Sequence, residues 1–281
     1  MLKLRDGIVE LYRKVATSLP PDIEEGLKSC LLREKKNSPA VPHLTVMLKD
    51  VRVSRETLRP ICEDTGVPVI YAKVPLGLSQ RDLRETIIEA TRLATSKVPL
   101  RPNAVDVLTG ENSGDNTGAG FPVIYLEETA GNALVIDLML KGGGCENIGQ
   151  TYKLPSEDLS AGQDLEGVRK CILDSVQKAQ GKGCPPYVIG VGLGAAKDQV
   201  AMLSKRQLMR KLNDRNDVDE LADLEERILE EINALEIGPK GLGGGATALG
   251  VKIGVNHRHP ESFFVDVSIA CWATRRGRLI W

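Results

Sequence analysis

The chain has 281 residues, 42% hydrophobic and 27% charged, so it is long enough to bury a core of ordinary globular composition. Lys and Arg number 37 against 38 Asp and Glu, and aromatic residues make up 4%, which gives no electrostatic or base-stacking case for nucleic acid. No apolar run reaches the about 18 residues of a membrane span, and the N-terminal segment lacks the features of a signal peptide, so we expect a cytoplasmic protein.

The first part of the chain is predicted to be helical. Apolar residues recur at helical spacing over 2–17. Pro20 and Pro21 end that helix and begin a second one over about 21–36, because proline is tolerated only in a first turn. A third helical stretch runs to about residue 57.

Strands and helices alternate in the remainder. Ser79 and Asp82 form a capping box at the start of one helix, and the apolar run 132–140 indicates a strand buried on both faces. The expected elements are strand 67–75, helix 80–97, strands 121–128 and 132–140 joined around Ala130–Gly131, helix 165–180, strand 187–192, helices 195–211 and 217–235, and strands near 249–255 and 263–270.

The sequence shows no fixed-period repeat and no low-complexity linker. It therefore predicts an α/β (mixed α+β) fold in a single compact domain over 1–281. A helical N-terminal region, 1–58, precedes an α/β region, 59–281, with mixed sheets flanked by helices.

Two glycine-rich segments resemble nucleotide-binding motifs, but other features of the sequence disfavour nucleotide binding. Residues 190–195 fit G-x-G-x-x-A, but no second strand ending in an acid follows about 20 residues later. The loop 238–250 has no G-K-[ST] ending, so it is not a P-loop. We expect its glycines to allow tight packing, with Lys240 or Thr247 at the edge of a site.

The six cysteines fall into two groups, and a disulfide framework is not expected in a cytoplasmic chain of this size. Cys30 and Cys171 lie in predicted helices among apolar neighbours, so we expect both in the core. Cys145 follows three glycines, and either a packing role or a site contact is open for it. The other three stand in turns or at strand ends, where rigid backbone presents side chains to a site: Cys62, Cys184 and Cys271.

Spacing alone is weak evidence that these three cysteines bind metal. They lie far apart in the sequence, and the absence of any C-x-x-C pair removes the zinc-ribbon and ferredoxin patterns. A zinc site built from the same thiols is one alternative.

Eight segments, in order, resemble the α subunit, or N-terminal domain, of the iron–sulfur (class I) fumarate hydratases and L(+)-tartrate dehydratases. The resemblance runs from about residue 5 to the C-terminus. The segments are RPICEDTG (59–66), KVPLRPNAV (97–105), GENSGDNTGAGFP (110–122), LKGGGCEN (140–147), GCPPYVIGVGLG (183–194), LEIGPKGLGGG (235–245), RHP (258–260) and CWATRRG (271–277).

The resemblance implies that Cys62, Cys184 and Cys271 ligate a [4Fe–4S] cluster whose fourth iron binds substrate. Three thiolates leave one iron open, as a Lewis-acid metal requires. The implied activity is the reversible hydration of fumarate to (S)-malate by a lyase of the tricarboxylic acid cycle. The alternatives are an L(+)-tartrate dehydratase α subunit and a non-catalytic iron–sulfur scaffold.

The resemblance also implies contacts to a small dicarboxylate substrate. Arg101 matches the family's substrate-binding arginine, whose planar fork suits a carboxylate, and His259 matches a family histidine near the substrate. Gly143 or Gly144 would offer a backbone N–H to a carboxylate, and which of them does so is open. We expect His257 to be structural or exposed.

Asp64 is the best candidate for proton transfer, because it stands two residues from a predicted cluster ligand. The alternative is an aspartate that only caps the turn before Thr65 and Gly66. Glu63 stands at a substrate contact where the family commonly has glutamine. A glutamate there would repel a dicarboxylate unless it were protonated or paired.

Family members carry a second, smaller domain that completes the site with further arginines, a lysine and a threonine. The sequence stops ten residues after Cys271. We therefore expect the chain to need a separate β subunit, to be inactive or nearly so alone, and to homodimerise into a higher heteromer.

Overall fold

The computed structural model describes all residues, 1–281, and their contacts divide the chain into two compact units. Unit 1 comprises residues 1–20, 49–143 and 273–281, and unit 2 comprises residues 21–48 and 144–272. Each unit is thus assembled from segments that are distant in sequence. The predicted single domain, divided at residue 58, is not tested by this partition and stays a prediction.

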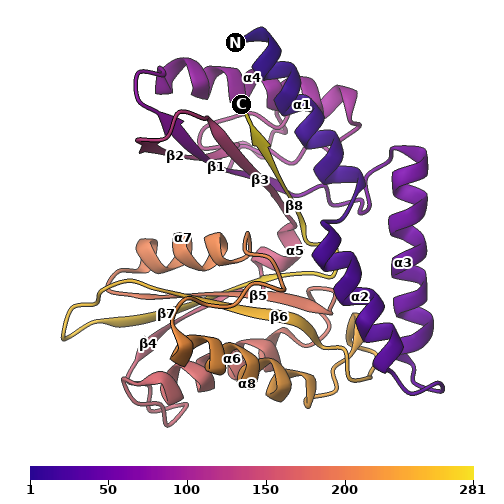
Figure 1. Ribbon diagram of the computed structural model, residues 1–281, viewed down its shortest axis with the longest axis vertical. Coiled ribbons are helices and arrows are strands. Elements are labelled where there is room, and N and C mark those ends of the chain that lie inside the picture. The colour runs from indigo at the N-terminus through magenta and orange to yellow at the C-terminus, as the bar shows by residue number, and fades with distance from the viewer. The chain divides into compact units, whose positions relative to one another are not determined.

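Unit 1 is a four-stranded sheet with helices on one face (Figure 1). Strand order is β2-β1-β3-β8; β1 and β2 are parallel, and the other pairs are antiparallel. The elements are α1 Leu2–Thr17, β1 Val67–Pro75, α4 Gln80–Lys97, β2 Val123–Thr129, β3 Val135–Lys141 and β8 Arg275–Ile280, with the second half of α3 Ala40–Thr57.

Alternation along β1 and helical spacing in α1 and α4 build the core of unit 1. Ile70, Ala72 and Val74 of β1 point to the helix-covered face and are almost completely buried, since successive strand residues face opposite sides. Tyr12 of α1 is fully buried, and its hydroxyl is 2.7 Å from the hydroxyl of Thr91 on α4. That hydrogen bond satisfies the polar atom of an otherwise apolar contact.

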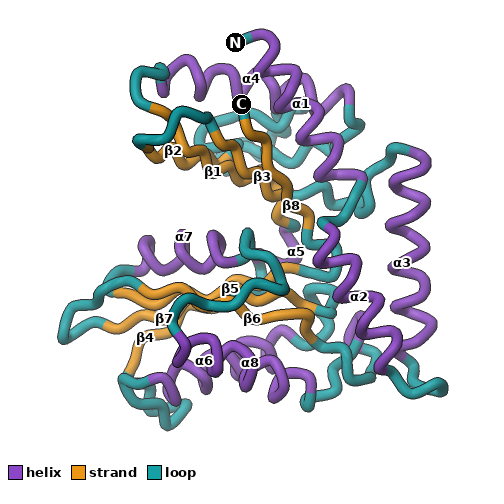
Figure 2. The backbone as a smooth tube through the Cα atoms, viewed as in Figure 1, coloured by secondary structure: helices purple, strands orange, loops and turns teal.

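Unit 2 is a second four-stranded sheet, ordered β4-β7-β5-β6, with helices on both faces (Figures 1 and 2). Strands β5 and β6 are parallel, and β7 is antiparallel to both β5 and β4. Helix α7 covers one face, and α6 and α8 cover the other. The elements are α2 Pro21–Arg33, α5 Gly143–Glu146, β4 Gln150–Leu154, α6 Leu165–Ala179, β5 Tyr187–Gly194, α7 Lys197–Gln207, α8 Asp219–Asn233, η1 Pro239–Gly241, β6 Ala248–Val255 and β7 Phe263–Ala270.

The glycines of β5 permit close packing of α7 on the sheet. A Cβ at Gly190 would lie 2.2 Å from the carbonyl oxygen of Ser204, and one at Gly192 would lie 2.3 Å from that of Val200. Alternate glycines therefore line the face under α7. The G-x-G-x-x-A pattern is explained by this contact between helix and strand, rather than by a phosphate-binding turn.

The mixed α/β class with sheets flanked by helices is confirmed, and three details differ from prediction. The short edge strands β4 and β8 were not predicted, because β4 has five residues and β8 carries three arginines. Strands 121–128 and 132–140 follow each other in sequence, yet β1 lies between β2 and β3. The helices predicted over 21–36 and 195–211 end earlier, at Arg33 and Gln207. No helix combines the length and apolarity that crossing a membrane requires.

Candidate active site

The loop between α3 and β1 holds the carboxylate of Asp64 in a fixed position. Its Oδ1 accepts the Gly66 N–H at 2.9 Å, and its Oδ2 accepts the Gly143 N–H at 2.8 Å. The first bond is the turn cap expected as the alternative to a catalytic role. The second ties the Cys62–Asp64 segment to the end of β3, so this carboxylate links two segments far apart in sequence.

Only glycine fits at position 66. Its φ is +82°, and a Cβ there would lie 2.9 Å from backbone atoms of Leu140 and Lys141. The close approach brings the Asp64 turn against β3, which carries the chain into Gly143.

Arg275, the first residue of β8, fixes the same turn from another side. Its Nη2 donates to the carbonyl oxygen of Asp64 at 2.8 Å, and the residue is only 2% exposed. Nε and Nη1 are buried without a hydrogen-bond partner. A buried cation with two unsatisfied donors opposes folding, so this position is not explained by stability alone.

Arg101 stands beside this turn because Thr65 joins the two segments. The Thr65 hydroxyl donates to the Arg101 carbonyl at 3.2 Å and accepts the Arg101 N–H at 3.1 Å. Asn116 donates to the same carbonyl at 3.0 Å and accepts the Asn103 N–H at 2.7 Å. The backbone at Arg101 is thus fixed, whereas its side chain is exposed and makes no hydrogen bond or ion pair within the chain.

Cys184 and Cys271 are neighbours in unit 2. Cys184 precedes β5 and Cys271 follows β7, and these antiparallel strands pair Val188 with Ala270 at that end of the sheet. The Trp272 N–H donates to the Cys184 carbonyl at 3.2 Å. Both cysteines are partly exposed, as is Cys62 in unit 1, and none of the six cysteines is in a disulfide.

Tyr187 braces the turn that carries Cys184. Its hydroxyl donates to the Gln180 carbonyl at 2.6 Å and accepts the Gly183 N–H at 3.1 Å. Burial raises the pKa of Tyr187, and the nearby thiols of Cys145, Cys184 and Cys271 raise it further. The phenol therefore stays protonated and keeps donating at neutral pH.

Cys145 and the glycine-rich loop also pack against this turn. Cys145 is 5% exposed, and its thiol donates to the Gly183 carbonyl at 3.4 Å, which favours a packing role. The Lys240 N–H donates to the Pro185 carbonyl at 2.9 Å, and a Cβ at Gly241 would lie 2.5 Å from the Cα of Gly181. The predicted tight packing of the glycine-rich loop is confirmed.

His259 lies at the other end of the unit 2 sheet. It is exposed in the loop between β6 and β7, where its Nδ1 accepts the Glu261 N–H at 3.1 Å. Strand β7 has eight residues, about 26 Å of extended chain, and separates this loop from Cys271. Unit 2 does not bring His259 next to Cys184 and Cys271, and its substrate contact stays a prediction. His257 is exposed, as expected.

Comparison with known proteins matches residues 5–279 to the family described as fumarate hydratase (Fumerase). The chain belongs to this family. It is 44% identical, over 98% of its length, to a protein described as a class I fumarate hydratase from Geobacillus stearothermophilus, of which it spans 54%, or about half. It is 37% identical to a protein from Methanocaldococcus jannaschii that is described as an L(+)-tartrate dehydratase subunit alpha, with 98% of this chain and 96% of that protein covered. The L(+)-tartrate dehydratase subunit alpha of Escherichia coli (strain K12) is 33% identical, with 99% and 90% covered.

The donor set fits the cluster that fumarate hydratase family membership implies, although no three His, Cys, Asp or Glu side chains are grouped as a metal site. Three partly exposed thiols stand in turns or at strand ends, and Cys184 and Cys271 are already adjacent. Cys30 and Cys171 are confirmed as core residues, 4% and 0% exposed. Burial raises the pKa of both thiols, that of Cys171 to about 12, which disfavours the thiolate a metal needs.

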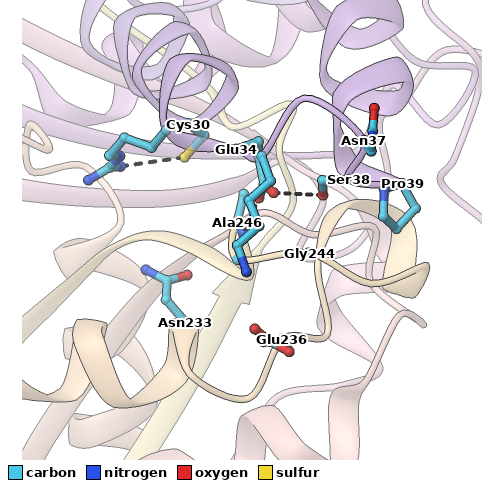
Figure 3. Close-up of a pocket in the computed structure, with 12 residues that line it drawn as sticks. Cys30, Glu34, Asn37, Ser38, Pro39, Asn233, Glu236, Gly244 and Ala246 are labelled. Carbon is cyan, nitrogen blue, oxygen red and sulfur yellow. Dashed lines mark hydrogen bonds between the residues drawn. The ribbon is translucent and has the colours of Figure 1, made fainter.

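A surface pocket of about 570 Å³ in unit 2 does not involve the predicted site (Figure 3). It lies between the end of α2 and the glycine-rich loop, and none of the predicted site residues lines it. Glu34 is committed there to packing, because its carboxylate accepts the Ala246 N–H at 3.0 Å and the Ser38 hydroxyl at 2.7 Å.

Four residues that hold the segments carrying predicted site residues were not singled out from the sequence: Thr65, Asn116, Tyr187 and Arg275. All four stand inside segments that carry the resemblance, which is the signal that could have found them. Thr65, Asn116 and Arg275 contact backbone groups of other segments, and Tyr187 contacts backbone groups of its own turn; such contacts leave no pattern in a single sequence.

Proposed function

We propose that the chain is the α subunit of a hydro-lyase that interconverts fumarate and (S)-malate. The observation that carries this proposal is the unit 1 arrangement in which Thr65 joins the Asp64 turn to the Arg101 segment. A fixed carboxylate, an exposed guanidinium and the Cys62 thiol thereby belong to one structural neighbourhood. Family membership supports the same reaction.

Cys62, Cys184 and Cys271 would hold a [4Fe–4S] cluster. When bound, the cluster supplies an open iron that acts as a Lewis acid toward the substrate hydroxyl. Three thiolates match this task, since a fourth protein ligand would close the site. The partial exposure of all three thiols supports this assignment over Cys30 and Cys171.

Other residues of the chain would bind the substrate and take part in proton transfer. Arg101 binds one substrate carboxylate through its planar fork. Asp64 takes part in moving the β-carbon proton, and its two backbone hydrogen bonds hold the carboxylate in one orientation. Gly144 is the better candidate for an N–H donor to substrate, because the Gly143 N–H already serves Asp64. Glu63 is exposed and contacts substrate only if protonated or paired by another group.

The site would be completed by a second polypeptide. The alpha-subunit names of relatives covered along 90% or more of their length support a separate β subunit. The heteromer would contain a homodimer of this chain and act in the cytoplasm, in the tricarboxylic acid cycle. Any contact of His259 with substrate would have to be made at the end of the unit 2 sheet opposite Cys271.

An L(+)-tartrate dehydratase is the second candidate, because the relatives matched along nearly their whole length carry that name. The hydroxy acids of the two reactions, malate and L-tartrate, differ in one hydroxyl group, so the same residues would serve either enzyme. Rates with fumarate and with L-tartrate, measured on the anaerobically purified heteromer, decide between them. A higher kcat/KM for L-tartrate would replace the fumarate assignment.

The replacement of Asp64 by Asn tests the proposed chemistry. We expect kcat to fall at least about a hundredfold, because the amide cannot take a proton. Iron and sulfide content should stay near that of the wild type. Asp50→Asn, an exposed change on α3 in the same unit, is the matched control and should keep full activity. Unchanged turnover in the Asp64→Asn heteromer would refute the role of Asp64, and a wild-type heteromer that holds its cluster but shows no turnover would favour a non-catalytic scaffold.

A further inference from the structure

The segment between Arg101 and Pro122 contains a small hairpin that presents apolar side chains to solvent. Val107 and Leu108 at its apex are 96% and 94% exposed, and Val105 on its rising arm is 52% exposed. Turn apices usually carry Gly, Pro, Asn, Asp or Ser, each for a local conformational reason. Two adjacent, fully exposed aliphatic residues do nothing for the turn itself.

The hairpin is rigid despite its exposure. Oδ1 of Asp106 accepts the N–H groups of Leu108 at 2.9 Å and Thr109 at 2.8 Å. The Asp106 N–H donates to the Glu111 carbonyl at 2.8 Å, and the Gly110 N–H returns to the Asp106 carbonyl at 2.9 Å. The hydrogen bonds from Thr109 and Leu108 also lower the pKa of Asp106, so this turn stays assembled at neutral pH. The apolar apex is therefore held in one conformation before anything binds.

The base of the hairpin is the segment that fixes Arg101. Asn112 Nδ2 donates to the Pro102 carbonyl at 3.1 Å, and the Ser113 N–H donates to the Ala104 carbonyl at 2.8 Å. Asn116, which holds the Arg101 carbonyl, follows directly. A polypeptide bound at the apex would thus contact a hairpin that begins only a few residues after Arg101, a proposed substrate ligand.

We propose that the hairpin 104–113 is a docking element for the second subunit of the hydro-lyase, an inference that rests on the two-polypeptide arrangement proposed above. The companion is indicated by the relatives described as alpha subunits. The surface of the second subunit that receives the hairpin would be an apolar hollow. Basic groups at the edge of that hollow would pair with Asp106 and Glu111 beside the apex.

A second copy of the chain is a poorer occupant of this surface. A symmetric contact would place the same patch on both partners and bring Asp106 and Glu111 of each close together. Like charges at a contact oppose association, whereas a chemically different partner can supply the opposite charge. A preorganised apex also binds with little loss of conformational freedom, which suits a permanent subunit contact.

The first test measures association of the two subunits. Val107→Ser with Leu108→Ser should raise the Kd of the heteromer about tenfold or more, because buried aliphatic contacts become polar ones. The control is Leu76→Ser, a 68% exposed leucine after β1 in the same unit, which should leave Kd unchanged. Thermal denaturation of the isolated variant chain should match the wild type, because Val107 and Leu108 are 96% and 94% exposed and their side chains are not part of a core. An unchanged Kd in the double variant overturns the proposal.

The second test identifies the occupant within the intact complex. A photo-crosslinking amino acid at position 108, in the chain co-expressed with its second subunit, should couple to that subunit, whereas the same group at position 76 should not. Coupling to another copy of this chain, or no coupling in an intact heteromer, overturns the docking assignment. A heteromer that turns over substrate but gives no such crosslink refutes the docking element and leaves the proposed function standing. A chain that forms no heteromer refutes both.

Discussion

Single residues in unit 1 contribute both to the folded structure and to the proposed chemistry. Asp64 caps its own turn and holds Gly143, so its carboxylate is oriented by the bonds that shape the loop. The structural and catalytic interpretations of this aspartate are compatible, because two backbone donors leave lone pairs available on both oxygens.

Gly66→Ala is expected to lower the free energy of unfolding by about 2 kcal/mol or more, since it combines a positive φ with a backbone clash. Gly77→Ala is the matched control: its φ is +83°, against +82° at Gly66, but no atom lies within 4 Å of the added Cβ. Urea denaturation of both variants separates the conformational penalty from the clash. Equal losses would show that the contact with β3 is unimportant.

Arg275→Met is expected to lower kcat of the heteromer by about tenfold or more, because misplacement of a reacting group is costly to rate. Stability should change little, since an aliphatic side chain of similar length replaces a buried cation with unsatisfied donors. Arg275→Lys, which keeps one donor, should recover part of the activity. Parallel losses of stability and activity in Arg275→Met would indicate a purely structural role.

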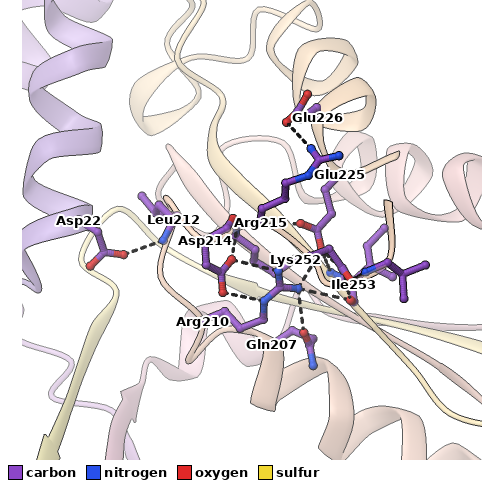
Figure 4. A network of polar contacts seen from close by, with 12 residues as sticks. Asp22, Gln207, Arg210, Leu212, Asp214, Arg215, Glu225, Glu226, Lys252 and Ile253 are labelled. Carbon is purple, nitrogen blue, oxygen red and sulfur yellow. Dashed lines mark hydrogen bonds and ion pairs between the residues drawn. The ribbon is translucent and has the colours of Figure 1, made fainter. Parts of the chain in front are cut away.

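At the scale of elements, polar groups join the segment that follows α7 to α8 and β6 in unit 2 (Figure 4). Glu225 of α8 accepts the Ile253 N–H of β6 at 2.7 Å and the Arg210 guanidinium at 2.9 Å. Lys252 is 4% exposed and donates to the Asp214 carbonyl at 2.7 Å. Buried charges are tolerated here because each is paired and hydrogen-bonded.

Asp214 should make the stability of unit 2 depend on acid pH. Burial alone would raise its pKa, but hydrogen bonds from Arg210 and Lys252 outweigh this and hold the pKa below its ordinary value. A depressed folded-state pKa adds stability above the unfolded pKa of about 3.9, and this stability is lost as the pH falls through the folded value. The stability gap between the wild type and Asp214→Asn should therefore narrow from pH 6 toward pH 3 in urea denaturation. A constant gap would contradict the coupling.

Over the whole molecule, two units with separate cores share the predicted cluster ligands, Cys62 in one and Cys184 with Cys271 in the other. Each unit forms around its own sheet, and the predicted ligands stand in turns or at strand ends rather than in the cores. Each predicted ligand is therefore positioned by the fold of its own unit.

The isolated chain, with its cluster reconstituted, should turn over at least about a hundredfold more slowly than the heteromer, because substrate ligands on the second polypeptide are missing. The measurement is fumarate hydration by anaerobic chain alone and after addition of the second subunit. Full activity of the chain alone would show that it holds a complete site.

Much of the fold was predictable because its signals are local. Helices α1 and α4, the buried strand β5 and the capping box at Ser79 follow from periodicity and from one side chain near its own backbone. The edge strands β4 and β8 were missed because their pairing comes from neighbours distant in sequence. The insertion of β1 between β2 and β3 has the same origin.

By itself the sequence determined the mixed α/β class, the family and the separation of Cys30 and Cys171 from the other cysteines, and it predicted Asp64 and Arg101 as site residues. These depend on residue type and on neighbours along the chain. Only the tertiary structure decided that Thr65 ties Arg101 to the Asp64 turn, that Gly143 serves Asp64, that Arg275 is buried behind it, and that β7 separates His259 from Cys271. The physical reason is that a hydrogen bond between distant segments depends on how sheets and turns bring backbone groups together, and this information lies in the fold rather than in any one stretch of sequence.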